Sequence, residues 1–144
     1  MTDVMNILSI DYGEKRIGFA IGDTERKIPN PLQVIQNNSI VSIIEEIKKI
    51  VLSYNVEKIV IGIPLNEDSS IGEQSNIVKE FSLIIEKELN IDVIGVDERF
   101  SSVDAEKLLL EQDMSRKKRK KIIDALAASI ILQRYFENDD LVNI

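Results

Sequence analysis

The sequence contains no cysteine and no histidine, and only 5% of its residues are aromatic. Without cysteine there are no disulfides, thiolate zinc sites or cysteine nucleophiles. Without histidine there is no Ser-His or Cys-His catalysis and no imidazole metal ligand. The few aromatic side chains also argue against a broad stacking platform for single-stranded bases. Any chemistry must therefore come from carboxylates, lysine, tyrosine and hydroxyl groups.

Long apolar runs are also missing, because no segment approaches the ~20 apolar residues that a membrane span needs. The N-terminal MTDVMN has no basic region followed by an apolar stretch, so it does not look like a targeting segment. We therefore expect a soluble, cytoplasmic protein that does not bind a membrane. A chain of 144 residues suits a single domain, residues 1–144, with one site.

Charge is unevenly distributed along the chain. The formal net charge is −7, yet residues 116–121 read RKKRKK, so the remainder is strongly acidic. Consecutive cations repel one another and are typical of either an anionic partner or a solvated loop. Composition alone leaves both interpretations open.

Hydrophobic periodicity predicts an α/β fold. The predicted strands cover residues 6–11, 16–23, 31–36, 58–63 and 91–96, and the predicted helices begin near 43 and cover 77–89, 101–112 and 119–137. Ser42 and Glu45 have the spacing of a capping box, which places the start of the first helix there. Gly13 is free to take a positive φ in the turn between the first two strands. Three antiparallel strands followed by right-handed crossovers indicate a mixed five-stranded sheet with helices on both faces.

One strand and one helix have matching faces of small residues. Every second residue of strand 16–23 is small, namely Gly18, Ala20 and Gly22, and such residues share a face. Asp124 shares a face of the last helix with Ala127 and Ala128. We expect the two faces to pack together and to carry Asp124 towards the sheet. The alternative is that Asp124 lies in an early helical turn, where the helix dipole favours a carboxylate.

Polar residues follow three of the predicted strands. Asp11 ends the first strand, Asn66 follows the fourth, and Asp97 and Glu98 follow the fifth. Sites in open α/β sheets form beyond the carboxyl ends of the strands. Carboxylates that converge there, without histidine or cysteine, are typical of a site for a hard cation such as Mg²⁺ or Mn²⁺.

Each of these acids also has a simpler interpretation. Asp11 is a possible turn former, and Glu98 is a possible ion-pair partner of Arg99 or a charge at a helix N-terminus. Asp97 and Glu98 are adjacent and point in different directions. The sequence therefore leaves open which of the two faces the site.

The same residues stand in four ordered blocks, SIDYGEKRIGFAIGD, IGIPLNEDSSIG, VDERFSSVDAE and IIDALAASIILQRYF. These blocks resemble the motifs of the YqgF family. The resemblance implies a ribonuclease H-like fold related to RuvC-type Holliday junction resolvases. It also implies a nuclease linked to maturation of the 5′ end of small-subunit (16S) ribosomal RNA. Mild departures from the family pattern at residues 67–70 and 100–102 concern loops and substrate contacts.

The resemblance places the family's acidic residues on Asp11, Glu98 and Asp124. In a two-metal scheme Asp11 would bridge both ions, and Glu98 and Asp124 would each hold one. The expected nucleic-acid contacts are Lys15, Arg16, Asn66, Arg99, Arg116, Lys117, Lys118, Arg119, Lys120 and Lys121. We expect RNA to be preferred over DNA, ribosomal precursor particles to be partners, and the protein to be a monomer or weak dimer.

Three other functions compete with this one. A Holliday junction resolvase acting on DNA would use the same acids, and a non-catalytic RNA-binding ribosome-assembly factor would have the same charge pattern. An actin-like phosphotransferase also has an Asp-x-Gly hairpin, but it closes two related domains around a nucleotide, and this chain has the length of one. The sequence does not distinguish endonuclease from exonuclease.

Overall fold

The computed structural model describes residues 4–65, 72–98, 116–137 and 141–142, with no side-chain description for 116–121 and 141–142. The order of elements is β1 (Asn6–Tyr12), β2 (Arg16–Asp23), β3 (Asn30–Gln36), α1 (Ile40–Tyr54), β4 (Val56–Ile63), α2 (Glu73–Leu89), β5 (Val93–Asp97), α4 (Arg116–Phe136) and β6 (Leu141–Val142). The helix predicted at 101–112 lies outside the described residues, as do Asn66 and Arg99. Across the described part of the chain, no helix combines the length and apolar content needed to cross a membrane.

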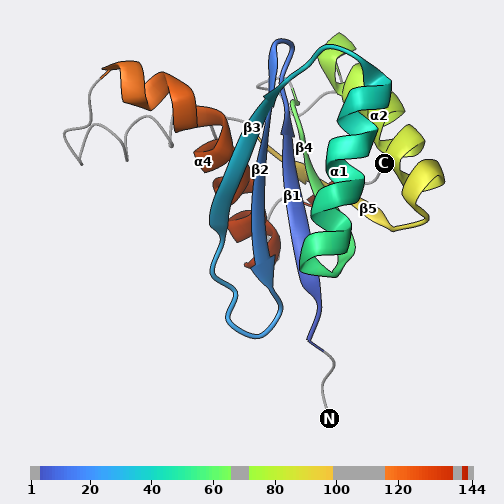
Figure 1. The fold of residues 1–144 in the computed structure, drawn as a ribbon, viewed down its shortest axis with the longest axis vertical. Coiled ribbons are helices and arrows are strands. Elements are labelled where there is room, and N and C mark those ends of the chain that lie inside the picture. The colour runs from blue at the N-terminus through green and yellow to red at the C-terminus, as the bar shows by residue number, and fades with distance from the viewer. Residues whose placement is uncertain (1–3, 66–71, 99–115, 138–140, 143–144) are drawn as a thin grey trace.

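The strands form one six-stranded sheet in the order β3-β2-β1-β4-β5-β6 (Figure 1). Strands β1, β2 and β3 pair antiparallel, and β1, β4 and β5 pair parallel. All five predicted strands and their mixed arrangement are confirmed. The sixth strand, β6, pairs antiparallel with β5 over two residues, which is too short for any periodicity in the sequence to indicate.

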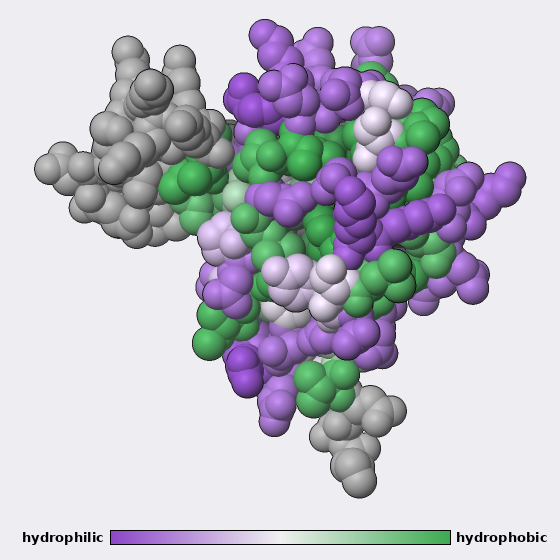
Figure 2. Space-filling model, viewed as in Figure 1, coloured by the Kyte–Doolittle hydropathy of each residue, from purple (hydrophilic) through white to green (hydrophobic). Residues whose placement is uncertain are grey.

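Helices cover both faces of the sheet (Figure 1). The α1/α2 face holds the larger core, built from aliphatic residues of β1, β2 and β4 together with α1 and α2. On the opposite face, α4 packs over a smaller core of Ile7, Val60, Val96, Ile131 and Leu132. The outer surface of α1 and α2 is polar with apolar interruptions (Figure 2), and its most exposed apolar residues are Val41, Leu52 and Leu83.

All three described helices begin before their predicted first residues, and α2 begins at Glu73 rather than at 77. Ser39, not Ser42, caps α1, because the Ser39 side chain accepts a hydrogen bond from the backbone N–H of Ser42. The predicted Ser42/Glu45 capping box is therefore wrong. Helix α4 begins at Arg116, so residues 116–121 form its first turns. They are not the loop that the simpler interpretation of the basic run assumed.

Candidate functional site

The α4 face of the sheet is built from small residues of β2 opposite β1. Asp11 pairs in register with Gly18, and Ser9 pairs with Ala20, so their side chains share one face. A Cβ on Gly18 would overlap the backbone carbonyl of Asp124. The Ser9 hydroxyl donates a buried hydrogen bond of 2.7 Å to the carbonyl of Ala128. The predicted contact between the small-residue face of β2 and the Asp124 face of α4 is confirmed.

Glu98 meets Asp11 at the carboxyl end of β5. The two side chains are joined by a hydrogen bond, and the backbone N–H of Glu98 donates to the carbonyl of Ile63 at 3.2 Å. Gly62 leaves the space that this arrangement needs, since a Cβ there would lie 2.5 Å from Glu98 Oε2 and 2.6 Å from Ile131 Cδ1. The fold therefore brings two carboxyl groups from distant parts of the sequence into contact.

Both carboxyl groups hold their protons more tightly than usual. Burial raises the pKa of Asp11 from 3.8 to about 6; the hydrogen bond from Glu98 opposes this rise and the charge of Asp124 adds to it. Burial raises the pKa of Glu98 well above its usual 4.5, and the charge of Asp11 and their hydrogen bond raise it further, while Arg134 opposes the shift. A hydrogen bond between two carboxyl groups requires a proton. The two groups therefore share a proton, which Glu98 donates to Asp11.

The structure distinguishes Glu98 from its neighbour Asp97. Asp97 pairs in register with Ile63, a residue of the core under α1 and α2, so strand alternation directs the Asp97 side chain to that face. The carbonyl of Asp97 accepts a hydrogen bond of 2.7 Å from Arg134 Nη1. Of the two acids, Glu98 is thus the one that contacts Asp11.

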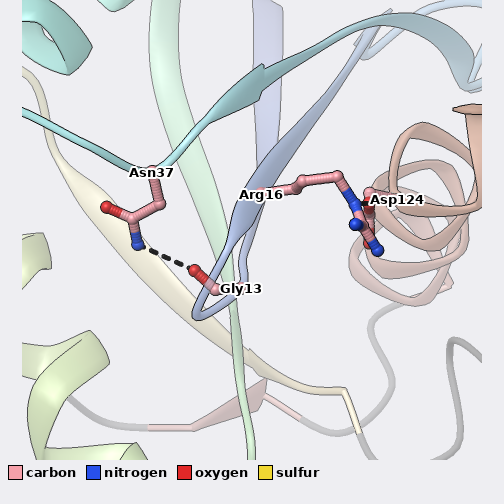
Figure 3. A network of polar contacts seen from close by, with 4 residues as sticks. All are labelled: Gly13, Arg16, Asn37 and Asp124. Atoms are coloured by element: carbon pink, nitrogen blue, oxygen red, sulfur yellow. Dashed lines mark hydrogen bonds and ion pairs between the residues drawn. The ribbon is translucent and has the colours of Figure 1, made fainter.

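Asp124 lies on α4 beside this pair, and its side chain is 17% exposed. Its Oδ2 forms an ion pair of 2.7 Å with Nε of Arg16, at the start of β2 (Figure 3). The alternative of a dipole-stabilised acid in an early helical turn is not supported, because α4 begins eight residues before Asp124 and the dipole effect fades within one turn. In the described part of the chain, no three acidic side chains gather closely enough to hold a metal ion as they stand. The Asp124 carboxylate is instead paired with Arg16.

The hairpin that carries Arg16 is held by hydrogen bonds within the turn and from Asn37, the residue that follows β3. The backbone N–H of Gly13 donates to the carbonyl of Arg16 at 2.9 Å. The Asn37 side chain donates to the carbonyl of Gly13 at 2.8 Å (Figure 3). The backbone N–H of Asn37 also donates to the carbonyl of Lys15, at 2.9 Å. Gly13 does not use its freedom to take a positive φ. Glycine is required there because a Cβ would lie 2.5 Å from the Arg16 carbonyl oxygen.

The predicted nucleic-acid contacts are only partly described. Lys15 and Arg16 are exposed beside the site, whereas Asn66, Arg99 and the side chains of 116–121 lie outside the description. Sequence reasoning missed Asn37 and Arg134. Arg134 lies three residues after Ile131 on the Asp124 stripe of α4, and that spacing was a usable signal. For Asn37 the sequence carried no such signal beyond its position directly after a strand.

Solved structures share this fold. *T. thermophilus* RuvC in complex with a Holliday junction substrate superposes with a TM-score of 0.60 at 14% identity, covering 96% of this chain and 99% of that one. The resolvase of fowlpox virus, in complex with Holliday junction DNA, superposes with a TM-score of 0.58 at 15% identity. The match covers 93% of this chain and 98% of the viral one. The chain thus has the ribonuclease H-like fold of these resolvases, as predicted.

Sequence comparison identifies the family. Residues 5–138 match the RuvX family, described as Holliday junction resolvase. A protein of *Caldanaerobacter subterraneus* subsp. *tengcongensis* named "Putative pre-16S rRNA nuclease" is 44% identical over 135 residues, which is 93% of this chain and 97% of that protein. A Clostridium tetani protein of the same name is 42% identical over 134 residues, which is 93% of this chain and 97% of that protein. The chain therefore belongs to the RuvX family, also called YqgF.

Proposed function

We propose that this protein is a cytoplasmic, metal-dependent nuclease that hydrolyses phosphodiester bonds during maturation of the 5′ end of the 16S ribosomal RNA precursor. The carrying observation is the buried contact between Asp11 and Glu98 at the carboxyl ends of β1 and β5. Membership of the RuvX family and the name of its curated relatives support the reaction and the substrate.

The donor set suits a divalent cation. The buried Asp11 carboxyl group and the partly buried Glu98 carboxyl group are in contact, which disfavours a second negative charge, and here one proton relieves the repulsion. Replacing that proton with a cation would leave oxygen ligands of the kind that Mg²⁺ and Mn²⁺ prefer. Asp11, Glu98 and Asp124 are the residues that would hold the metal. Divalent ions held there would supply an activated water and stabilisation of the leaving oxygen.

Other parts of the chain position these acids. Gly62 leaves room for the Glu98 side chain, and the hydrogen bond from Ser9 to α4 fixes the helix that carries Asp124. Burial keeps Asp11 at 7% exposure, so water competes little for its oxygens. These residues hold the carboxylates in place and do not react themselves.

The substrate is proposed to be single-stranded or loosely structured RNA within ribosomal precursor particles. Lys15 and Arg16 lie beside the acids, and residues 116–121 precede Asp124 on α4. Cations at these places suit the phosphate backbone, which positions a nucleic acid without reading its bases. A small footprint of this kind fits one strand bound by a monomer or weak dimer.

The direct test compares cleavage of labelled precursor RNA, the matching DNA strand and a four-way DNA junction in Mg²⁺ or Mn²⁺. Wild type should cut the RNA, and Asp11→Asn should not, because the amide keeps the size of the side chain but loses its charge. Asp23→Asn is the matched control: Asp23 ends β2 at the other end of the hairpin, and its Oδ1 accepts backbone hydrogen bonds from Glu25 and Arg26, which an amide oxygen also accepts. This variant should cut normally.

Each other outcome contradicts the proposal in a distinct way. Cleavage by Asp11→Asn at the wild-type rate would exclude the metal site. Symmetric cutting of the junction with the RNA intact would favour the resolvase function that the family description names. RNA binding without cleavage by wild type would favour a non-catalytic assembly factor.

A further inference from the structure

The third acid, Asp124, is held in an ion pair with Arg16. Arg16 Nε and Asp124 Oδ2 are 2.7 Å apart, and the two side chains are 50% and 17% exposed. Figure 3 shows the guanidinium reaching from the start of β2 to the Asp124 carboxylate on α4. Arginine is thus half in solvent while it neutralises an acid at the edge of the candidate site.

The backbone on both sides of this ion pair is held firmly. Close contact with Gly18 fixes the main chain of Asp124, and the Ser9 hydrogen bond anchors the next turn of α4. Asn37 pins the hairpin before Arg16 through two hydrogen bonds. Any rearrangement here is therefore confined to the two side chains.

We propose that the ion pair between Arg16 and Asp124 acts as a latch. It breaks when a substrate phosphodiester binds the Arg16 guanidinium in place of the Asp124 carboxylate. This inference rests on the proposed function, because it concerns how the same site is completed. A phosphate group competes well for a guanidinium, which binds phosphate and carboxylate with the same fork of N–H donors. When Arg16 turns to a phosphate, the Asp124 carboxylate loses its partner and rotates towards Asp11 and Glu98. Three carboxylates then face the metal only when substrate is present.

The latch makes metal binding and nucleic-acid binding reinforce each other. Such coupling is reciprocal, so the factor by which nucleic acid raises metal affinity equals the factor by which metal raises nucleic-acid affinity. Arg16 acts here as a positioning residue. Removing the Arg16 guanidinium should abolish the coupling between metal affinity and nucleic-acid affinity. The loss of a simple phosphate contact would weaken nucleic-acid binding but leave that coupling in place.

The experiment measures two affinities with Ca²⁺ as the probe metal, since it takes the same oxygen ligands. Calorimetry gives the Ca²⁺ affinity of the protein alone. Fluorescence anisotropy gives the affinity for a short single-stranded RNA with and without Ca²⁺ at constant ionic strength. The variant is Arg16→Gln, and the matched control is Lys15→Gln, which removes an equal charge from the neighbouring exposed position.

For wild type, Ca²⁺ should tighten RNA binding about 5-fold or more, within the usual range of coupling. In Arg16→Gln, RNA binding should weaken and the Ca²⁺ effect should fall below about 2-fold. Without RNA, this variant should bind Ca²⁺ more tightly than wild type, because Asp124 is already released. Lys15→Gln, which removes a proposed phosphate contact, should also weaken RNA binding but should keep the wild-type Ca²⁺ effect. An oligonucleotide with uncharged methylphosphonate linkages should show no Ca²⁺ effect with wild type.

Two results would overturn the latch while leaving the metal site standing. One is an Arg16→Gln variant that keeps the full Ca²⁺ effect on RNA binding. The other is an Arg16→Gln variant that, without RNA, binds Ca²⁺ no more tightly than Lys15→Gln does. A wild-type protein that binds no Ca²⁺ under either condition would instead contradict the proposed function itself.

Discussion

The two faces of the central sheet are made from alternate residues of the same strands, yet they differ in size and polarity. Towards α1 and α2, the strands present large side chains such as Ile10, Phe19 and Ile61. Towards α4, the positions beside them are Ser9, Asp11, Gly18, Ala20 and Gly62. Large aliphatic residues stabilise the fold by burial. Small residues let a helix approach the sheet closely and leave room for carboxyl groups. One face therefore provides the stability that allows the other to hold buried acids.

Among substitutions on the two faces, Gly18→Val on the α4 face is expected to lower the free energy of unfolding most. The added side chain meets the backbone of Asp124 and Ala125, which cannot move aside as a flexible side chain would. We expect a loss of about 3 kcal/mol or more in the free energy of unfolding, the upper range for overpacking. Ile17→Val, on the opposite face, should cost only about 1 kcal/mol. Urea denaturation measures both, and equal losses would show that the close approach of α4 is not a constraint.

The second effect is a pH dependence caused by the buried acids. Because the pKa of Asp11 is raised from 3.8 to about 6, the folded protein holds more protons than the unfolded chain between these values. Stability should therefore fall as pH rises from about 4 to about 6, by roughly 3 kcal/mol at about 1.4 kcal/mol per pKa unit. The raised pKa of Glu98 acts in the same direction.

Asp11→Asn supplies the control for that pH dependence. Without the Asp11 charge, the metal-free variant should lose much less stability over this range and should be the more stable protein at pH 7. Mg²⁺ should stabilise wild type at pH 7 by preferential binding to the folded state, and it should not stabilise the variant. Thermal unfolding at several pH values measures this, and parallel curves for the two proteins would contradict the account.

The smallest predicted difference in stability is between alanine substitutions of two buried serines, Ser9 under α4 and Ser82 in α2. The Ser9 hydroxyl links β1 to the carbonyl of Ala128, whereas the Ser82 hydroxyl bonds to the carbonyl of Val78 within its own helix. Ser9→Ala should cost about 1 kcal/mol, the usual net value of a hydrogen bond. Ser82→Ala should be close to neutral, because such bonds within one helix contribute little. A greater loss at Ser82 would contradict the proposed role of the Ser9 link.

Much of the fold could be predicted because its signals are local. The alternation of Gly18, Ala20 and Gly22 and the helical spacing of Asp124 and Ala128 each follow from one element, and together they predicted the packing of α4. The five strands were predicted from runs of the same kind. The start of α1 was misplaced because Ser39 and Ser42 both have capping side chains, and only the backbone decides between them.

The arrangement of the site was harder to predict, because it depends on contacts between distant residues. Choosing Glu98 over Asp97 requires the register between β4 and β5, which no single segment carries. The pairing of Arg16 with Asp124 joins residues 108 positions apart. The three acids themselves were predicted from strand ends, a helix face and family resemblance. Their role as metal ligands stays a prediction.

The most direct test of the central claim is a crystal structure of the protein soaked in Mn²⁺ near pH 7, with anomalous scattering used to locate the metal. The account predicts an anomalous peak between Asp11 and Glu98, with both carboxylates bound to it and their mutual hydrogen bond broken. A site with no peak at saturating Mn²⁺, or a peak elsewhere with that hydrogen bond intact, would contradict it.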